Sequence, residues 1–584
     1  MSEHATNLLN RLETLILREA NEQREQLERQ WSLPLSERVR TGKAIEGLRL
    51  GGINDQTGRV RLICQTNNSR FREGDHLLLH KGHPLLEAGF ECVLELDEEQ
   101  VLEVVPQGLN VNRLIEEPEG WIADEGFLDM SGYYLQALVE VADRQVGRSR
   151  ILPLILGDIA PTIDYASYER GWKAATDAGL NQSQAEAVAQ AYATDLVYLI
   201  QGPPGTGKTL VLAHIARLLA EEGERVLVTA LTHRAINNAL NTLAKVAPDL
   251  PVCKIGHQAR ADGLNVPNYE SFEYSEVVQL ADGYVIGATP FATRTNRLAE
   301  VEFDTVLFDE ASQVTLPLAI MGMLVGKRYV FIGDDCQLPP VTTLRNPPLL
   351  AQSSIFSYLS GRGYGEMLNL TYRLNDQLTA WPSRNFYDNR LQPAPGIGER
   401  RLRLRKAPKK WQDILDPEYP VMFVDVGQVN TTVRSQREAE MVVDLVMRLL
   451  ESGTPPDDIG VVSPYRAQGR VIRNMLRNLI RDPDIYRAIV VDTVERMQGQ
   501  EREVILVSLT TSNPFFAAEL ADFFFQPQRL NVTITRPRTK LIIVGSSHVL
   551  QARPGDPALA GWVRLFEDLL RSCSRYTVTY GEGS

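Results

Sequence analysis

The stretch that decides the fold is Gln201-Gly-Pro-Pro-Gly-Thr-Gly-Lys-Thr209. The apolar run 196–200 precedes it and is typical of a buried strand, and the apolar content of 210–219 after it indicates a helix. A glycine loop between a strand and a helix N-terminus points backbone N–H groups at phosphates, and the helix dipole favours negative charge there. Lys208 would reach the β- and γ-phosphates, and the Thr209 hydroxyl would bind Mg²⁺. The stretch therefore predicts a nucleoside triphosphate site in preference to an ordinary flexible turn before a helix.

Composition places the chain among soluble globular proteins. At 584 residues, with 43% apolar and 23% charged residues, it is too long for one hydrophobic core and is expected to form about three or four domains. No apolar run is long enough to span a bilayer, and Met1–Thr6 lacks the pattern of a signal peptide. The five cysteines include no Cys-x-x-Cys pair, which argues against a zinc or iron–sulfur site and favours a reducing compartment. We therefore expect a cytoplasmic protein that does not bind a membrane.

The net charge of −13 argues against a protein that coats nucleic acid, because phosphate contacts need Lys and Arg. A protein that moves along nucleic acid needs a basic surface only where the strand runs. The most basic stretch is 400–410, and a solvated loop or an edge strand explains it better than a strand-binding surface does.

Before the phosphate loop, the sequence predicts a helix followed by a small β-barrel. Residues 6–30 carry leucines at helical spacing among charged residues. Residues 48–105 change to short alternating runs, which are typical of barrel strands. Turn signals separate these runs at Thr57-Gly58 and Glu73-Gly74-Asp75. A helical stretch at 133–141 and a connector at 153–161 complete the region.

From about residue 180 onward, continuous apolar runs alternate with helices, which indicates parallel sheets covered on both faces. The first series of predicted strands comprises residues 226–230, 284–288, 305–308 and 328–332. The second series comprises residues 421–424, 459–462, 488–491, 504–507 and 541–544. We predict an α/β fold with a helical stalk (1–46), a β-barrel accessory domain with connector (47–160), a first lobe (161–365) and a second lobe (366–584).

Two strand ends carry side chains suited to phosphate chemistry. Asp309 and Glu310 follow the strand 305–308, where Asp309 can hold Mg²⁺ and Glu310 can orient and deprotonate an attacking water. Gln337 follows the next strand, and its amide can sense the γ-phosphate. The alternatives are a solvated carboxylate pair at the first strand and a proline-terminated strand end at the second. The phosphate loop earlier in the chain favours the catalytic interpretation of both.

Further motifs follow in the order of a known family. The motifs are Gly202–Thr209, Asp309–Ser312, Gly333–Pro339, Leu370–Leu374, Ile459–Gln468, Thr493–Glu501 and Arg529–Arg538. Together they resemble superfamily 1 helicases, and most closely the 1B branch that contains the nonsense-mediated-decay helicase, senataxin and the immunoglobulin mu-binding helicase. The resemblance implies two tandem RecA-like lobes that use ATP and Mg²⁺. Thr371, Leu374–Asp376, Glu495 and Met497 depart from the family's pattern.

The resemblance implies a nucleotide site shared by both lobes. Its nucleotide-binding residues would be Gln184, Gly202, Pro203, Pro204, Gly205, Thr206, Gly207, Lys208, Thr209, Tyr372, Gln498, Gly499 and Glu501, and its metal ligands would be Thr209 and Asp309. Gln184 would read the adenine edge, Tyr372 would stack on the base and Glu501 would hold the ribose. Without the family, a glutamine such as Gln184 is more often a surface residue, and a buried core tyrosine is an equal interpretation of Tyr372.

Two arginines of the second lobe would complete the catalytic set. The resemblance implies that Arg373 and Arg536 contact the γ-phosphate as arginine fingers, and a planar guanidinium suits the charge spread over phosphoryl oxygens. Gln498 would lie near the same phosphate. Since Glu310 belongs to the first lobe, hydrolysis would require closure of the cleft between the lobes. The predicted catalytic residues are thus Lys208, Asp309, Glu310, Gln337, Arg373 and Arg536.

The resemblance also implies a surface for single-stranded nucleic acid. Its residues would be Thr232, His233, Arg234, Thr289, Pro464, Tyr465 and Thr493. Hydroxyl and backbone donors suit phosphate contacts that do not depend on base sequence. Tyr465 can stack on a base or pack within the protein, and both alternatives stay open.

The sequence therefore predicts an ATP-dependent 5′→3′ helicase or translocase on single-stranded DNA or RNA, with the polarity implied by the resemblance. The alternative is a nucleotide-dependent clamp that binds a protein or nucleoprotein partner without processive unwinding. A small-molecule P-loop kinase is disfavoured, because such kinases lack a second lobe carrying Arg373 and Arg536. We expect a monomer whose partner is single-stranded nucleic acid, with room for protein partners. No identifiable 2′-hydroxyl reader separates RNA from DNA.

Overall fold

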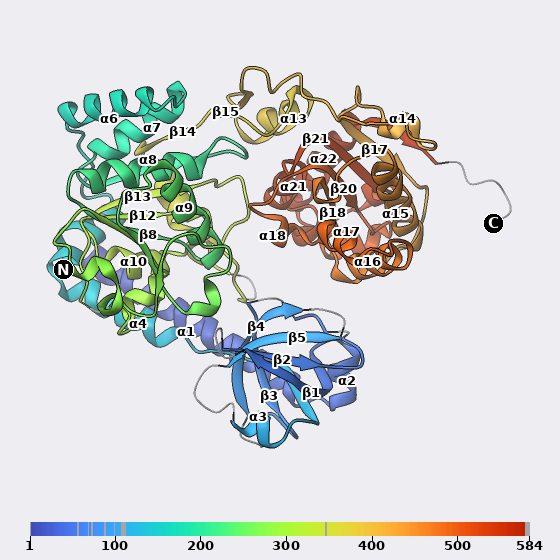
Figure 1. The fold of residues 1–584 in the computed structure, drawn as a ribbon, viewed down its shortest axis with the longest axis horizontal. Coiled ribbons are helices and arrows are strands. Elements are labelled where there is room, and N and C mark those ends of the chain that lie inside the picture. Colours follow the sequence, from blue (N-terminus) through green and yellow to red (C-terminus); the bar gives the residue numbers. More distant parts are fainter. Residues whose placement is uncertain are drawn as a thin grey trace.

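The computed structural model describes residues 2–54, 58–67, 69–71, 74–86, 89–97, 100–106, 112–298, 300–344 and 347–578. It contains a closed antiparallel barrel and two lobes built on parallel sheets, so the predicted α/β fold class is confirmed. In Figure 1 the first lobe lies at the left, the second at the right in orange and red, and the barrel below them in blue. Thr57 and Glu73, which belong to two predicted turn signals, lie outside the described residues. Within the described ranges, each helix is too short or too polar to cross a lipid bilayer.

A long amphipathic helix runs along the first lobe. The helices of the N-terminal region are α1 (Glu3–Trp31), α2 (Leu35–Arg40), α3 (Asn112–Glu116), α4 (Ser131–Asp143) and α5 (Leu152–Leu156). Leu8, Leu12 and Ile16 form the buried stripe of α1, which packs against α4 and α5. The connector predicted at 153–161 begins inside α5, because Pro153 occupies the first turn of a helix, where no backbone N–H donor is needed.

The barrel closes in the order β1-β2-β5-β4-β3-β6. Its strands are β1 (Ala44–Asn54), β2 (Arg59–Ile63), β3 (His76–His80), β4 (Phe90–Asp97), β5 (Val101–Pro106) and β6 (Trp121–Glu125). Closure leaves no free sheet edge, and alternate side chains such as Leu62, Leu77, Leu94 and Trp121 fill the interior.

The first lobe is an 8-stranded parallel sheet in the order β10-β9-β11-β8-β12-β13-β7-β14. Its strands are β7 (Val197–Gln201), β8 (Arg225–Thr229), β9 (Val252–Ile255), β10 (Asn268–Tyr269), β11 (Tyr284–Gly287), β12 (Thr305–Phe308), β13 (Arg328–Gly333) and β14 (Gly365–Met367). Its helices are α6 (Tyr165–Asp177), α7 (Gln182–Ala193), α8 (Lys208–Glu221), α9 (His233–Val246), α10 (Leu316–Met323), α11 (Leu349–Gln352) and α12 (Ile355–Ser360). Helices α7, α8 and α9 cover one face, and α10 and α12 together with α1, α4 and α5 cover the other. Apolar residues therefore point to both faces of each central strand, as the continuous apolar runs predict.

The second lobe is a 6-stranded parallel sheet in the order β19-β18-β20-β21-β17-β22. Its strands are β17 (Val421–Asp425), β18 (Ile459–Val462), β19 (Val490–Asp492), β20 (Arg502–Ser508), β21 (Pro537–Gly545) and β22 (Ser574–Thr577). Its helices are α13 (Asp376–Phe386), α14 (Gln412–Leu415), α15 (Gln436–Glu451), α16 (Arg466–Leu479), α17 (Pro483–Ala488), α18 (Val494–Met497), α19 (Pro514–Glu519), α20 (Ala521–Phe524), α21 (Pro527–Ile534) and α22 (Pro557–Ser572). A small ladder of β15 (Leu370–Thr371) and β16 (Gln392–Pro393) lies in the segment between the lobes.

A buried charge cluster joins α2 to the barrel. The Arg38 guanidinium donates to a carboxylate oxygen of Asp124, and His80 Nε2 lies 2.8 Å from the same oxygen. The side chains of all three residues are at most 2% exposed. A buried ion pair of this kind is costly to break from one side, because the remaining charge stays out of water.

We predict that Asp124→Ala lowers the free energy of unfolding of the barrel by about 3–5 kcal/mol, because Arg38 loses its buried counterion. Hydrogen exchange of the amides in β1 and β6 measures this loss locally, without requiring two-state unfolding of the whole chain.

Arg24→Ala is the matched control, since Arg24 and Asp129 form an ion pair at 2.7 Å whose side chains are 52% and 38% exposed. Its effect should stay below about 1 kcal/mol. Equal losses for the two variants would contradict a stabilising role for the buried cluster.

Candidate active site

The predicted phosphate loop lies between the carboxyl end of β7 and the first turn of α8. Gly205 and Gly207 have φ values of 75° and 83°, which only glycine adopts readily. A Cβ at Gly205 would lie 2.4 Å from Cβ of Arg373, which follows β15. Glycine at this position therefore permits close approach between the loop and the segment that leads into the second lobe.

Side chains beneath the loop hold its shape. The Thr206 hydroxyl donates to the carbonyl of Pro203 at 2.8 Å, and Lys208 Nζ donates to the carbonyl of Gly202. Gln184 Nε2 donates to the Thr206 carbonyl at 3.0 Å, and its Oε1 accepts from the Asn181 backbone N–H. Gln184 is 3% exposed, so the alternative of a surface glutamine is wrong. In this structure it completes a capping box at the start of α7 and supports the loop.

Asp309 and Glu310 follow the carboxyl end of β12. Asp309 is 5% exposed, and burial together with the neighbouring Glu310 raises its pKa above the usual range, with Lys208 opposing the shift. Oxygen donors are the ligands that Mg²⁺ prefers, and a divalent cation would relieve the repulsion between these two carboxylates. These carboxylates therefore suit a divalent cation, and the assignment of Mg²⁺ to Thr209 and Asp309 stays a prediction.

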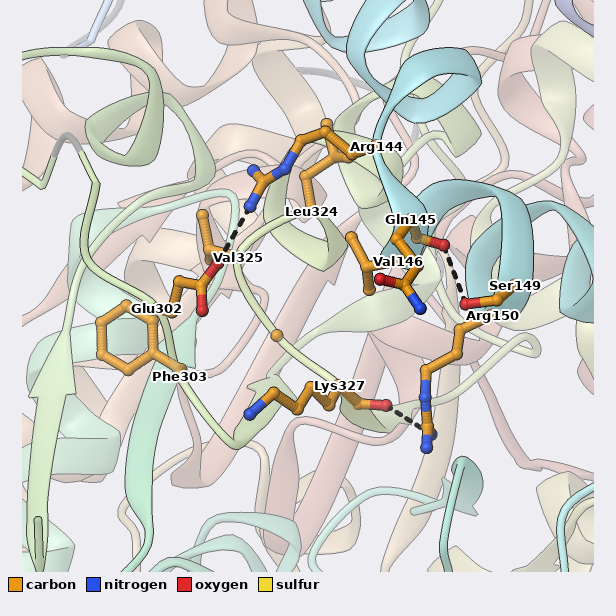
Figure 2. A pocket seen from close by; sticks show the side chains of 11 residues that line it. Arg144, Gln145, Val146, Ser149, Arg150, Glu302, Phe303, Leu324, Val325 and Lys327 are labelled. Carbon is orange, nitrogen blue, oxygen red and sulfur yellow. Dashed lines mark hydrogen bonds and ion pairs between the residues drawn. The ribbon is translucent and has the colours of Figure 1, made fainter.

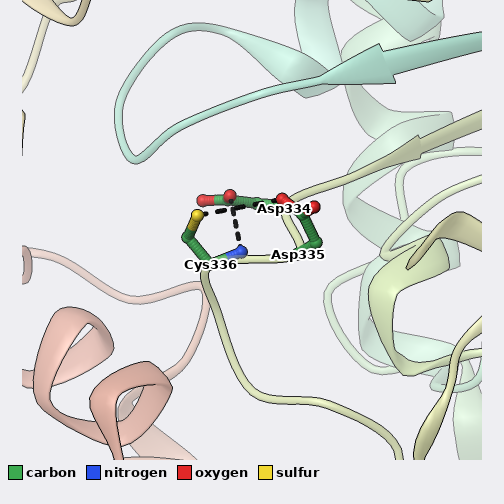
Figure 3. Close-up of side chains that lie close together, drawn as sticks. All are labelled: Asp334, Asp335 and Cys336. Carbon is green, nitrogen blue, oxygen red and sulfur yellow. Dashed lines mark hydrogen bonds between the residues drawn. The ribbon is translucent and has the colours of Figure 1, made fainter. Parts of the chain in front are cut away.

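Gln337 follows β13 and is 4% exposed. Its Nε2 donates to Asp334 at 2.8 Å. Figure 3 shows Asp334 beside Asp335 and Cys336, whose possible ligand atoms lie within 4.8 Å of one another. The Cys336 backbone N–H and the Gln201 amide donate to these carboxylates, and we assign no metal to them.

The two predicted arginine fingers meet at the end of α21. Arg373 donates from Nη1 to the Thr535 carbonyl at 3.1 Å and from Nε to Glu501. Arg536 is 2% exposed and donates from Nε to the Val532 carbonyl at 2.8 Å. Burial and the charge of Arg373 lower the pKa of Arg536 to about 9, so it is still a cation at pH 7.

Glu501 accepts hydrogen bonds from two guanidiniums, those of Arg373 and Arg538. The bond from Arg538 is 2.6 Å long. Burial opposes its ionisation, but the charges of Arg373 and Arg538 lower the pKa of Glu501 to about 2. In this structure its carboxylate oxygens are thus engaged by arginines. Arg538 is a further residue of the site that the roles implied by the resemblance did not include.

One cleft of about 310 Å³ collects most of the predicted residues. From the first lobe it is lined by Pro204, Gly205, Thr206, Gly207, Lys208, Thr209, Glu310 and Gln337. The residues that follow the first-lobe sheet and line its other side are Tyr372, Arg373, Gly499, Glu501 and Arg536. Gln184, Gly202, Pro203, Asp309 and Gln498 are outside this lining.

Tyr372 lies at the mouth of the cleft and is 44% exposed, so the alternative of a buried core tyrosine is wrong. Its hydroxyl accepts from Asn181 Nδ2 at 2.9 Å, and its backbone N–H donates to the Gly205 carbonyl. Asn181 is another site residue that sequence reasoning missed. Its position three residues before Gln184, as in a capping box, is the signal that could have identified it.

The predicted strand-contacting residues follow the carboxyl ends of parallel strands in both lobes. Thr232 and Thr289 follow β8 and β11, and Pro464 and Thr493 follow β18 and β19. By contrast, Arg536 lies at the amino end of β21, so in the second sheet the cleft lies at the amino edge, whereas Pro464 and Thr493 lie at the carboxyl edge.

The predicted strand-contacting side chains differ in exposure, charge and packing. Arg234 is exposed, whereas Thr232 caps α9 and Thr493 is 5% exposed. Burial and then the charge of Lys254 lower the pKa of His233 to about 3, so this ring is neutral at pH 7. Tyr465 packs against Phe516 and Phe523, and its hydroxyl accepts from Thr511, which favours the packed alternative for this residue.

Two other features have no part in the cleft. The basic run 400–410 is a loop, and its Arg405 backbone N–H donates to the Ser452 carbonyl after α15. A hollow of about 440 Å³ lies near the amino ends of β12 and β13, beside the π-helical turn Gly147–Ile151. Figure 2 shows the side chains that line it. Arg144 pairs there with Glu302 at 3.2 Å, and Arg150 donates to the Lys327 carbonyl at 3.0 Å.

Comparisons with known proteins agree with the motifs. Two family models, both described as an AAA domain, match residues 351–548 and residues 179–274 with 265–344. The DNA replication ATP-dependent helicase/nuclease DNA2 of Saccharomyces cerevisiae is 29% identical over 429 residues, covering 68% of this chain and 27% of that protein. The Regulator of nonsense transcripts 1 homolog of Arabidopsis thaliana is 31% identical over 429 residues, covering 64% of this chain and 33% of that protein. The chain thus spans about a quarter to a third of the length of these relatives.

Among solved structures, the arterivirus nonstructural protein 10 (helicase) has a TM-score of 0.40 at 13% identity, covering 91% of this chain and 82% of that chain. From the two family models, the curated relatives and the ordered motifs, we conclude that the chain belongs to the superfamily 1 helicases, of the type that includes the nonsense-mediated-decay helicase.

Proposed function

We propose that this chain is an ATP-driven motor that moves 5′→3′ along single-stranded DNA or RNA. The observation that carries the proposal is the cleft in which Lys208 and Glu310 of the first lobe face Arg373 and Arg536. Three cations and a carboxylate around one cleft match the needs of phosphoryl transfer to water. The polarity rests on the resemblance to the 1B branch alone.

Each residue has a distinct task in this proposal. Lys208 would bind the β- and γ-phosphates, and Glu310 would accept a proton from the attacking water. Thr209 and Asp309 would hold Mg²⁺, which when bound neutralises charge on the phosphate oxygens. Arg536, still charged at pH 7, and Arg373 would stabilise the charge that develops on the transferred group.

The sheet edges at which these residues lie suggest how ATP hydrolysis would move a nucleic-acid strand. The nucleotide would touch the carboxyl edge of the first sheet and the amino end of β21 in the second. Thr232 and Thr289 on one lobe and Pro464 and Thr493 on the other would hold the strand at the carboxyl edges. Closing the cleft around ATP would then change the distance between the two sets of strand contacts.

We predict that single-stranded oligonucleotides stimulate ATP turnover by the wild-type chain and that Glu310→Gln lowers the stimulated rate at least about 10²-fold. The amide keeps the size of the side chain but cannot accept the proton. Nucleotide binding should persist in Glu310→Gln and should weaken in Lys208→Ala, and a fluorescent ATP analogue measures both.

Glu273→Gln is the control, because Glu273 is exposed and lies outside the cleft. Near-normal turnover by Glu310→Gln would show that another group activates the water. If single-stranded oligonucleotides do not stimulate ATP turnover by the wild type, the proposed motor function is wrong.

A second prediction concerns movement rather than hydrolysis. A duplex with a single-stranded 5′ tail should be displaced in the presence of ATP, and the same duplex with a 3′ tail should not. Gel separation of labelled strands measures the displacement, with Glu310→Gln as the inactive control. Stimulated turnover without displacement of either duplex would instead identify a nucleotide-dependent clamp, and displacement from the 3′ tail would reverse the proposed polarity.

A further inference from the structure

A buried hydrogen-bonded contact joins the two lobes behind the cleft. Asn531, in α21 of the second lobe, is fully buried. Its Nδ2 donates to the backbone carbonyl of Cys336 at 2.9 Å, directly after the first-lobe strand β13. The same nitrogen donates to the hydroxyl of Tyr387 at 2.7 Å. The first lobe and the helix that precedes Arg536 are therefore in direct polar contact.

Asp334 extends this contact to the cleft. The carboxylate that Figure 3 shows at the start of the turn after β13 is 1% exposed. One of its oxygens, Oδ2, accepts from Gln337 Nε2 at 2.8 Å and from the Tyr387 hydroxyl at 2.8 Å. Gln337 lines the nucleotide cleft. A single oxygen therefore connects the predicted phosphate sensor with the tyrosine that holds Asn531.

Further hydrogen bonds connect Asn531 with both arginines. They complete a network that comprises Gln337, Asp334, Tyr387, Asn531 and Thr535. The Asn531 carbonyl accepts from the Thr535 hydroxyl at 2.6 Å, one turn further along α21. The Thr535 carbonyl accepts from Arg373 at 3.1 Å, and Arg536 is the next residue. A rotation or shift of α21 therefore changes the position of both guanidiniums together.

The members of this network are shielded from water, so the loss of any one of their hydrogen bonds is costly. Asp334, Tyr387 and Asn531 are each at most 1% exposed. In a site of low dielectric, a hydrogen bond to a carboxylate is stronger than in water, and a donor left without a partner is costly. A displacement of Gln337 by a phosphate would therefore be passed on to Tyr387 and Asn531 rather than absorbed by solvent.

We propose that Tyr387 is a positioning residue that links the phosphate sensor to the arginine-bearing helix, through Asp334 on one side and Asn531 on the other. The inference rests on the proposed ATP-driven function. Tyr387 itself is not among the residues that line the cleft. It makes the position of α21 depend on whether Gln337 contacts a γ-phosphate, so the placement of both arginines in the cleft responds to a bound triphosphate.

Hydrogen exchange with ADP, with and without beryllium fluoride as a γ-phosphate mimic, tests the link without requiring hydrolysis. In the wild type, the mimic should increase protection of the phosphate loop and of α21 relative to ADP alone. In Tyr387→Phe, which keeps the ring and its packing, the loop should keep this extra protection while α21 loses it. Extra protection of α21 that persists in Tyr387→Phe would overturn the proposal.

Turnover provides a second readout. Removal of the Tyr387 hydroxyl should lower kcat for ATP about tenfold while KM changes less than about twofold, since the ground-state contacts to nucleotide are intact. Asn531→Ala should have the same effect, and the double variant should show little further loss, because both residues act in one network.

Tyr329→Phe is the matched control. Tyr329 is also fully buried, and its hydroxyl donates to the Gly326 carbonyl at 2.9 Å, in the first lobe and outside the cleft. The two phenylalanine variants should lower Tm by similar amounts, but only Tyr387→Phe should lower kcat. Equal kcat for the two variants would contradict the link. If wild-type turnover is not stimulated by oligonucleotides, the motor function fails, and the hydrogen-exchange comparison still decides on the link.

Discussion

Positively charged side chains repel one another in a partly buried cleft, so a cluster of them favours a ligand of opposite charge. Lys208, Arg373 and Arg536 converge on one cleft in this structure, and burial together with Arg373 already lowers the pKa of Arg536. Glu501 offsets part of this charge from the side of Arg373. A triphosphate with its cation is the ligand that would balance the rest, and glycines in a phosphate loop allow backbone N–H groups to point at it. The remaining architecture holds these cations in place.

Each half of the site is positioned by a rigid parallel sheet. The phosphate loop and the carboxylate pair are placed by the carboxyl ends of β7 and β12, and Arg536 is placed by the amino end of β21. Ligands of open α/β sheets bind outside the carboxyl ends of the strands, and the first lobe follows this rule. The second lobe presents its amino edge to the cleft. That difference leaves its carboxyl edge available for the residues expected to contact a nucleic-acid strand.

Sequence patterns predicted the fold well wherever a strand is continuously apolar. The strands 305–308 and 459–462 have the predicted bounds, because they are buried on both faces. The strands β9 and β22 were not predicted, since Lys254 interrupts the first and Ser574–Thr577 is a polar edge strand. Strand β21 begins at Pro537 rather than Leu541, because its first residues are polar yet paired with β20.

The site was predictable to the extent that its residues are grouped in short motifs. The phosphate loop and Glu310 are recognised locally, and the structure brings them to the cleft with Arg373 and Arg536. The contacts of Tyr387 could not be predicted, because its partners lie 53 and 144 residues away and no local pattern relates them. Gln184 and Glu501 were predicted as direct nucleotide ligands, and the structure shows that their polar atoms already bond within the protein.

The proposed mechanism requires that a γ-phosphate be contacted from both lobes at once. Calorimetry of ADP, alone and with aluminium fluoride as a transition-state analogue, compares the wild type with Arg536→Gln. We predict that ADP affinity changes less than about twofold in Arg536→Gln, while affinity for the analogue falls at least about tenfold, because the guanidinium acts on charge that develops only in the transition state. Equal affinity of both proteins for the analogue would contradict the proposed mechanism.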